Sequence, residues 1–301
     1  MNANTKNNKE FLDLATYAFH KPKTKERAKA FDKLLEFSTP YGHYENQRLT
    51  SMVIDSHFNV YVASYPEFRG NGAIRQLMTK SLRDNYEKGV IFSYLAPFSY
   101  AFYEKFGYHY AFNQKHYRLA AQDFPKGKRS AGEISREKFE FDDENASEFS
   151  VSKNTALFKV ELWSYFFSFK SQPHCAIYRE NSKALGYLLY EFSEMTFVIK
   201  ELITLTDEAK QAFYRFISSH AGSFSEISWQ APSDILLEEE LTEPQRAEIK
   251  LVPYMQARIV NLQEFLKVHG QSDFSVEITD EIIPENNISL GEGKREKMTI
   301  G

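Results

Sequence analysis

The sequence predicts an α+β chain, α/β-like in its alternation, in which mixed sheets are flanked by helices. Two patterns and the length predict this class. The first half reads as helix, helix, strand, strand, helix, strand, helix and strand, and the second half repeats the alternation. The chain of 301 residues is about twice as long as an average domain. With 42% hydrophobic and 26% charged residues, its composition is typical of globular domains and excludes wholesale disorder.

Two helices open the chain. Apolar residues at three- and four-residue spacing predict the first over 11–19, and Thr24 is the expected cap of the second, which ends before Pro40. A strand, a turn and a second strand are expected over 42–57. A short apolar strand at 60–64 follows and leads into the most informative part of the sequence.

The rest of the first half alternates between helices and strands. A loop at 66–72 precedes a helix over 74–86, and the next strand at 89–95 is apolar without interruption, which is typical of a central strand. A short helix at 100–106 and a strand at 108–119 complete this half.

A linker at 122–130 separates the halves. A helix-rich block is expected at 145–169, followed by three strands, a helix and a strand at 175–178, 186–192, 196–202, 208–220 and 226–230. After Arg258 the pattern changes to a short helix at 262–266 and an alternating strand at 274–278, and the polar tail over 291–301 is expected to be mobile.

The composition excludes several classes of partner. A net charge of −4 argues against a general nucleic-acid binder, and no apolar run approaches the roughly 20 residues of a membrane helix. A single cysteine, Cys175, and a polar first segment without the apolar core of a secretion signal predict a cytoplasmic protein. The eight histidines lack metal-ligand spacing, so no metal is expected.

The loop Arg69-Gly70-Asn71-Gly72 lies between the short apolar strand and an amphipathic helix. Glycines let a backbone approach an anion closely, and the first N–H groups of a helix carry partial positive charge. We interpret the loop as a pyrophosphate site, with a purely structural turn as the alternative. It is neither a P-loop nor a dinucleotide fingerprint, because no Gly-Lys-Ser/Thr follows and the glycine spacing differs.

The same residues resemble the acetyl-CoA loop of the GNAT N-acetyltransferases. The wider stretches YVASYPEFRGNGAIRQLM and SYLAPFSYAFYEKFGYHYAF resemble the Eis (enhanced intracellular survival) type, which carries two GNAT domains and a sterol-carrier-like C-terminal domain. VPYMQARIVNLQEFL resembles the start of that third domain. The resemblance implies tandem GNAT folds: a domain with the acetyl-CoA loop at 1–121, a second, degenerate GNAT-like domain at 131–255 and a partial sterol-carrier-like α/β domain at 256–301.

The resemblance also implies acetyl-CoA as co-substrate and a set of residues that bind it. The backbone of Val62, Ala63 and Ser64 would pair with the pantetheine arm, while Phe98 and Ser99 would line the thioester end. The pyrophosphate would be held by Arg69, Gly70, Asn71, Gly72, Ala73, Ile74 and Arg75. Tyr103 would be the general acid that protonates the coenzyme A thiolate, a role that suits a phenol with an ordinary pKa of about 10.

We therefore expect an acyltransferase that transfers an acetyl group from acetyl-CoA to a primary amine by direct attack. A polyamine, an aminoglycoside and a protein lysine all fit as acceptor, and the resembled family implies a homo-oligomer, often a hexamer. The alternative is a non-catalytic acyl-CoA-binding, ligand-binding or assembly protein with a degenerate GNAT fold. Two departures from the family favour it: the short region between Phe58 and Tyr61, and a chain that stops at Gly301 before the third domain is complete.

Overall fold

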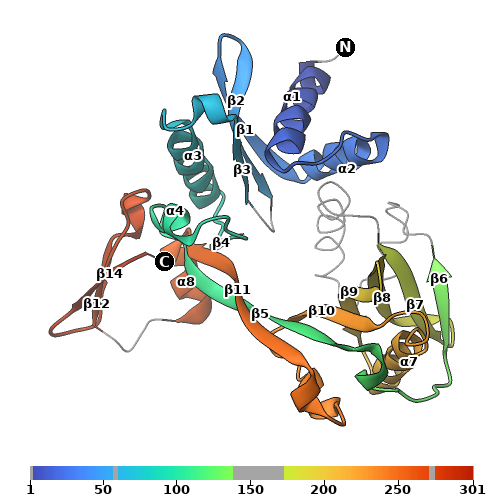
Figure 1. Ribbon diagram of the computed structural model, residues 1–301. Coiled ribbons are helices and arrows are strands. Elements are labelled where there is room, and N and C mark those ends of the chain that lie inside the picture. The colour runs from blue at the N-terminus through green and yellow to red at the C-terminus, as the bar shows by residue number, and fades with distance from the viewer. Residues whose placement is uncertain (1–2, 57–59, 138–172, 271–274, 301) are drawn as a thin grey trace. The chain divides into compact units, whose positions relative to one another are not determined.

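The structure of the chain, a computed structural model, describes residues 3–56, 60–137, 173–270 and 275–300 (Figure 1). The helix-rich block that we predict at 145–169 lies outside the described residues. The described residues divide into two units. The first is formed by the chain up to Ala111 and from Tyr254 onward, and the second by the chain between Phe112 and Pro253.

The first unit is built from both ends of the chain. Two long strands, β5 (His109–Ala120) and β11 (Glu248–Ile259), contribute residues to both units. The other elements of the first unit are α1 (Ala3–Ala18), α2 (Lys25–Glu36), β1 (Ser38–Glu45), β2 (Arg48–Ser56), β3 (Val60–Ser64), η1 (Pro66–Phe68), α3 (Ala73–Glu87), β4 (Phe92–Leu95), α4 (Tyr100–Glu104), α8 (Leu262–His269), β12 (Val276–Thr279), η5 (Pro284–Asn286), β13 (Ile288–Leu290) and β14 (Glu296–Thr299).

A three-stranded antiparallel sheet in the order β1-β2-β3 forms the N-terminal part of this unit. Because side chains alternate along a strand, the central strand β2 is buried on both faces. Met52 and Ile54 pack in one apolar cluster with α1 and α2, whereas Val53 packs in another with α3. Figure 1 shows α3 on one side of the sheet and the α1–α2 pair on the other. The predicted cap is confirmed, since Thr24 accepts a hydrogen bond from the N–H of Arg27.

Strand β4 differs from its prediction. It pairs antiparallel with β11 alone among the described strands, so it is an edge strand and the expectation of a central strand is wrong. Its apolar character comes from helix packing instead, because Leu95 is buried in one cluster with α3 and α4 residues such as Leu77 and Tyr103. As a result, β3 and β4, the strands on either side of α3, belong to different sheets.

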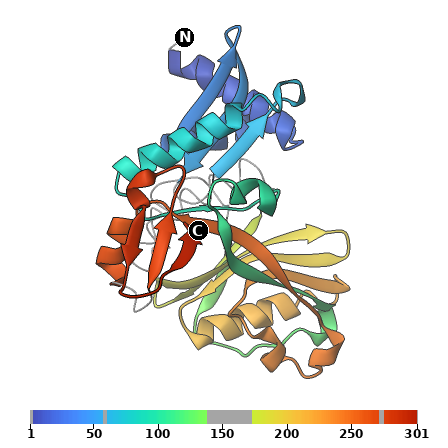
Figure 2. The same ribbon diagram turned by 90° about the vertical axis from the view of Figure 1, so that its left-hand side faces the viewer.

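The C-terminal segment is more ordered than its polar sequence suggests. β12 pairs antiparallel with β13 and parallel with β14, which lies in the polar tail 291–301. Ile300 is buried, and its N–H donates to the carbonyl of Thr279. An ion pair between Arg83 of α3 and Glu285 of η5 joins this segment to α3, and Figure 2 shows the two side by side.

In its described residues, the second unit consists of strands and the helix α7. Its elements besides β5 and β11 are η2 (Ala121–Asp123), β6 (Glu133–Glu137), β7 (His174–Glu180), β8 (Lys183–Ser193), β9 (Thr196–Thr204), α7 (Asp207–Ser218), β10 (Glu226–Pro232), η3 (Leu237–Glu240) and η4 (Pro244–Arg246). The strands follow the order β5-β10-β9-β8-β7-β6, in which only the β9–β10 pair is parallel. Strands β6 and β11 are not among the strands predicted from the sequence. No helix in the described part of the chain is long and apolar enough to cross a membrane.

Candidate functional site

A cavity of about 760 Å³ lies in the first unit, between the end of β3, the start of α3 and α4. All predicted cofactor-binding residues line it except Ser99: Val62, Ala63, Ser64, Arg69, Gly70, Asn71, Gly72, Ala73, Ile74, Arg75 and Phe98. The loop and the strand before it are close together in the sequence, whereas the aromatic segment after β4 lies further along the chain. The fold brings all three together around the cavity.

The glycine loop has the backbone conformation that its sequence predicts. Gly70 and Gly72 have φ angles of 84° and 83°, in the left-handed region that favours glycine, and a Cβ at either would meet no atom within 4 Å. Gly72 is the N-cap of α3, whose first turn carries no acidic residue. The space above both glycines is thus open toward the positive end of a helix dipole.

The Asn71 side chain fixes the shape of this loop. Its Oδ1 accepts from the N–H of Ala73 at 3.0 Å, and its Nδ2 donates to Glu45 Oε1 at 2.9 Å. The N–H of Ala73, which we expected to face the pyrophosphate, is therefore already bonded within the loop. The next two N–H groups, those of Ile74 and Arg75, are first-turn donors that an α-helix leaves without partners of its own.

The charges that line the cavity are all positive. Arg69, Arg75 and Lys105 have no carboxylate partner among the described residues, and no Asp or Glu belongs to the lining. Three unpaired cations beside a helix N-terminus favour an anionic ligand. Coenzyme A carries such an anion in its pyrophosphate, so the residues present fit this group.

Strand β3 supplies the extended part of the cavity wall. Among the described strands it pairs only with β2, so no described strand occupies its other backbone edge along residues 62–64. An open strand edge can pair with an extended ligand through main-chain N–H and C=O groups. This is the arrangement that we predict for Val62, Ala63 and Ser64.

The segment that begins at Phe98 carries aromatic rings into the cavity. Phe98 is 71% exposed and lines the cavity with Phe102 and Phe106. Ser99 is the N-cap residue of α4, and its side chain makes no cap hydrogen bond. Six further residues line the cavity although they are not among the predicted site residues: Ala18, Phe19, Phe68, Phe102, Lys105 and Phe106. The spacing of 98, 102, 105 and 106 is a one-faced helical pattern that could have predicted the last three.

Tyr103 lies behind this aromatic wall. Its side chain is 2% exposed, is absent from the cavity lining and makes edge-to-face contacts with Phe98 and Phe102 at centroid distances of 5.4 and 5.0 Å. Its hydroxyl has no hydrogen-bond partner among the described residues. Burial raises the pKa of Tyr103 above its ordinary value, so the phenol keeps its proton.

The second unit lacks an equivalent site at the corresponding position. There, too, a helix follows a strand, since α7 follows β9, but no glycine lies between the end of β9 and the start of α7. Thr206 caps α7 with its side chain, and Asp207 and Glu208 occupy the first turn. Two carboxylates at the helix N-terminus repel a pyrophosphate.

Two other chemistries find no support in the described residues. The Cys175 thiol is buried, and burial raises its pKa to about 12, so it is not a nucleophile at neutral pH. The described residues contain no group of three or more His, Cys, Asp or Glu side chains that could hold a metal ion.

The sequence matches known protein families. Residues 2–111 and 157–259 match two families that are both described as an acetyltransferase (GNAT) domain. No curated protein sequence matches the chain.

Solved structures resemble the whole fold. A conserved protein of unknown function from Enterococcus faecalis V583, described as a probable N-acyltransferase, is 31% identical with a TM-score of 0.80, covering 98% of this chain and 85% of that chain. A GCN5-related N-acetyltransferase from Anabaena variabilis ATCC 29413 is 17% identical (TM-score 0.77, 98% and 85% covered). Eis1 from Mycobacterium abscessus is 18% identical (TM-score 0.70, 98% and 83% covered). At these identities the last two show the fold alone.

Proposed function

Because this chain belongs to the GNAT acetyltransferase family and carries two GNAT domains in tandem, we propose that it is an acetyl-CoA-dependent N-acetyltransferase that acts on a primary amine. Acyl transfer is the chemistry of the family. The observation that carries the finer proposal is the cavity of the first unit, which is lined by a left-handed glycine loop, a helix N-terminus and three cations without a carboxylate partner in the described part of the chain.

In this proposal the residues of the first unit bind acetyl-CoA, orient its pantetheine arm and protonate the departing sulfur. Arg69 and the loop Gly70–Arg75 hold the pyrophosphate, and the open edge of β3 at 62–64 aligns the pantetheine arm. Acetyl-CoA supplies the acetyl thioester. The amine would attack its carbonyl carbon directly, the carbon–sulfur bond would break, and Tyr103 would donate its proton to the departing sulfur. The proton that the amine nitrogen loses would pass to solvent, and a solvent proton would restore the phenol. Phe98 and Ser99 would border the thioester.

The finer assignments rest on the same resemblance. We propose an Eis-type protein, a type consistent with the Eis1-like fold, with residues 256–301 as part of a sterol-carrier-like domain and with a homo-oligomeric state in the cytoplasm. The acceptor is proposed to be a small amine or a protein lysine, without nucleic-acid or membrane partners. The second GNAT domain is proposed to be degenerate, which the acidic start of α7 supports.

Acetyl-CoA binding and acetyl transfer, measured side by side, test the proposed function. Isothermal titration with acetyl-CoA gives affinity and stoichiometry, and thiol release with spermidine, kanamycin and a lysine peptide as acceptors gives turnover. One bound acetyl-CoA per chain together with turnover on one amine supports the proposal. One bound acetyl-CoA per chain with no turnover on any of the three amines would favour the non-catalytic binding protein.

The glycine loop gives the first prediction. Gly72→Val should weaken acetyl-CoA binding about tenfold, because a β-branched residue at a φ of 83° strains the loop by about 1–3 kcal/mol. Titration calorimetry measures the dissociation constant. The matched control is Gly222→Val in the second unit, where φ is not positive and a Cβ meets no atom within 4 Å. Equal affinities of the two variants would contradict the assigned role of the loop.

The buried phenol gives a prediction on pH. Burial raises the pKa of Tyr103, so the protonated form persists to higher pH than in a free tyrosine. With saturating amine and acetyl-CoA, kcat should therefore not fall between pH 7 and pH 10. An ordinary phenol with a pKa of about 10 would lose about half of its acid form at the upper end of this range. A fall in kcat as the pH rises from 7 to 10, abolished by Tyr103→Phe, would contradict the prediction.

A further inference from the structure

Strand β11 carries two polar side chains that are almost fully buried. Gln256 and Arg258 are 0% and 1% exposed, and they stand opposite Leu95 and Ser93 of β4. Residues two apart on a strand point to the same face. Both side chains reach the backbone around α4, the short helix that carries Tyr103.

Gln256 holds the two ends of the α4 segment. Its Nε2 donates to the carbonyl of Tyr100 at 3.3 Å, at the start of the helix, and to the carbonyl of Tyr108 at 3.2 Å, after its end. Both partners are acceptors, so the orientation of the amide is fixed. Its Oε1 is buried without a partner among the described residues, although a methionine of similar size would avoid that cost. Toward the described part of the chain, the amide therefore bonds through its donor half alone.

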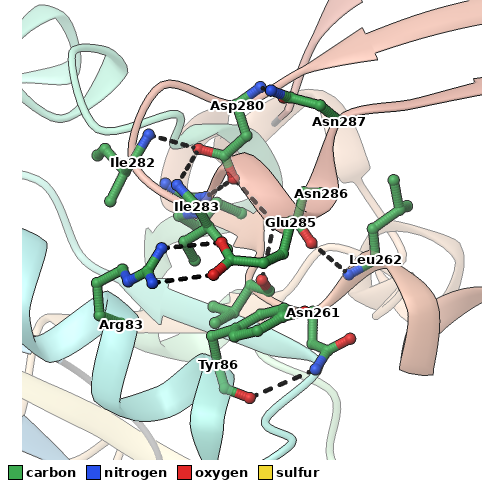
Figure 3. Close-up of polar contacts among 12 residues, drawn as sticks. Arg83, Tyr86, Asn261, Leu262, Asp280, Ile282, Ile283, Glu285, Asn286 and Asn287 are labelled. Atoms are coloured by element: carbon green, nitrogen blue, oxygen red, sulfur yellow. Dashed lines mark hydrogen bonds and ion pairs between the residues drawn. The ribbon is translucent and has the colours of Figure 1, made fainter.

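Arg258 holds the turn between these ends. Its Nη1 donates to the carbonyl of Phe106 at 2.5 Å, and its Nη2 donates to Asp280 Oδ2 at 2.5 Å. Asp280 is fixed in turn, because its carboxylate also accepts from the N–H groups of Ile282 and Ile283 and from Asn286 Nδ2 (Figure 3). The guanidinium therefore joins the carbonyl of Phe106 to a carboxylate that is itself held by three further donors.

These bonds lead directly to Tyr103. The N–H groups of Phe106 and Tyr108 both donate to the carbonyl of Tyr103, at 2.9 and 3.2 Å. Helix α4 has five residues, too few to be stable by itself, so its geometry depends on contacts from outside. The turn is also closely packed, since a Cβ at Gly107 would lie 2.9 Å from the carbonyl oxygen of Ile300 and 3.3 Å from Arg258 Nη1.

We propose that Gln256 and Arg258 are positioning residues for acyl transfer in the first unit. They tie the carbonyls of Tyr100, Phe106 and Tyr108 to β11 and thereby aim the Tyr103 hydroxyl at the departing sulfur. The inference rests on the proposed function, in which Tyr103 is the acid. It assigns a role in this site to residues that follow Tyr103 by roughly half the chain and that line no part of the cavity.

The test is a double-mutant cycle with Tyr103→Phe. Gln256→Met removes the amide donors, and Arg258→Lys keeps a charge for Asp280 but loses the forked geometry that reaches Phe106 as well. Each variant is made alone and in the Tyr103→Phe background. With the fastest of the three acceptor amines, kcat and the KM for acetyl-CoA are measured and scaled to the number of acetyl-CoA sites found by calorimetry. Gln245→Met and Arg246→Lys, both exposed in η4, are the matched controls.

A positioning role has a distinct signature in this cycle. Each single variant should lower kcat about tenfold per intact site, with the KM for acetyl-CoA changed less than threefold, and should cause no further loss once Tyr103 is Phe. The same loss in both backgrounds, or full kcat in Gln256→Met, overturns the proposal and leaves the proposed function intact. Full kcat in Tyr103→Phe alone would show that Tyr103 is not the general acid. The positioning proposal would then be overturned as well. If Arg258→Lys fails to fold, Gln256→Met alone decides.

Discussion

Tyr103→Phe should lower kcat about 100-fold and leave the affinity for acetyl-CoA unchanged. General acids contribute about 10² to 10⁴ to a rate, and Phe keeps the ring but has no proton to give. The hydroxyl makes no hydrogen bond to the described residues, so its removal costs the fold little, and the contacts of the ring with Phe98 and Phe102 remain. Steady-state kinetics together with titration calorimetry separate the two effects.

The control for this prediction is Tyr214→Phe, in the second unit, which removes another buried phenol hydroxyl, one that bonds to Glu240. It should keep full kcat while losing about 1 kcal/mol of stability. If Tyr103→Phe lowered kcat and acetyl-CoA affinity by the same factor, the residue would shape the binding site and not deliver a proton.

Asp280→Asn should lower the free energy of unfolding by about 3–5 kcal/mol, the largest stability effect that we expect. Arg258 and Asp280 form an ion pair whose side chains are 0% and 1% exposed, and the neutral amide would leave the guanidinium charged and buried without a counterion. Urea titration followed by circular dichroism measures the loss.

Glu285→Gln, a few residues further along the chain, is the matched control. Glu285 is paired with Arg83 at 2.8 Å, but both side chains are about 40% exposed, so the loss should stay below about 1 kcal/mol. Losses of similar size in the two variants would show that burial does not set the strength of the Arg258–Asp280 pair.

The features that the sequence predicts best are those with local causes. A left-handed backbone at Gly70 and Gly72 and the start of α3 depend on neighbouring residues, so the loop and most of the cavity lining could be predicted. The same holds for the cap at Thr24. Tyr103 is different, because its role comes from a family resemblance and not from any local pattern.

Strand β11 could not be predicted in this way. Its first half is exposed and mixed in character, and its buried half contains Gln256 and Arg258, residue types that usually face solvent. Their partners are carbonyls roughly 150 residues earlier, a distance at which no sequence period gives a signal. The edge position of β4 has the same origin, since an apolar run does not reveal whether sheet or helix covers it.

The use of both chain ends in the first unit has a consequence for biosynthesis. A ribosome makes Tyr103 before the second unit and Gln256, Arg258 and Asp280 after it. Residues 112–253 can thus begin to fold before Gln256 and Arg258 are present to bond the backbone around α4. The first unit, although its N-terminal part is made first, is completed last. A nascent chain stalled before residue 254 therefore carries the entire glycine loop and the first half of β11, but not Gln256 and Arg258, which we propose to align Tyr103.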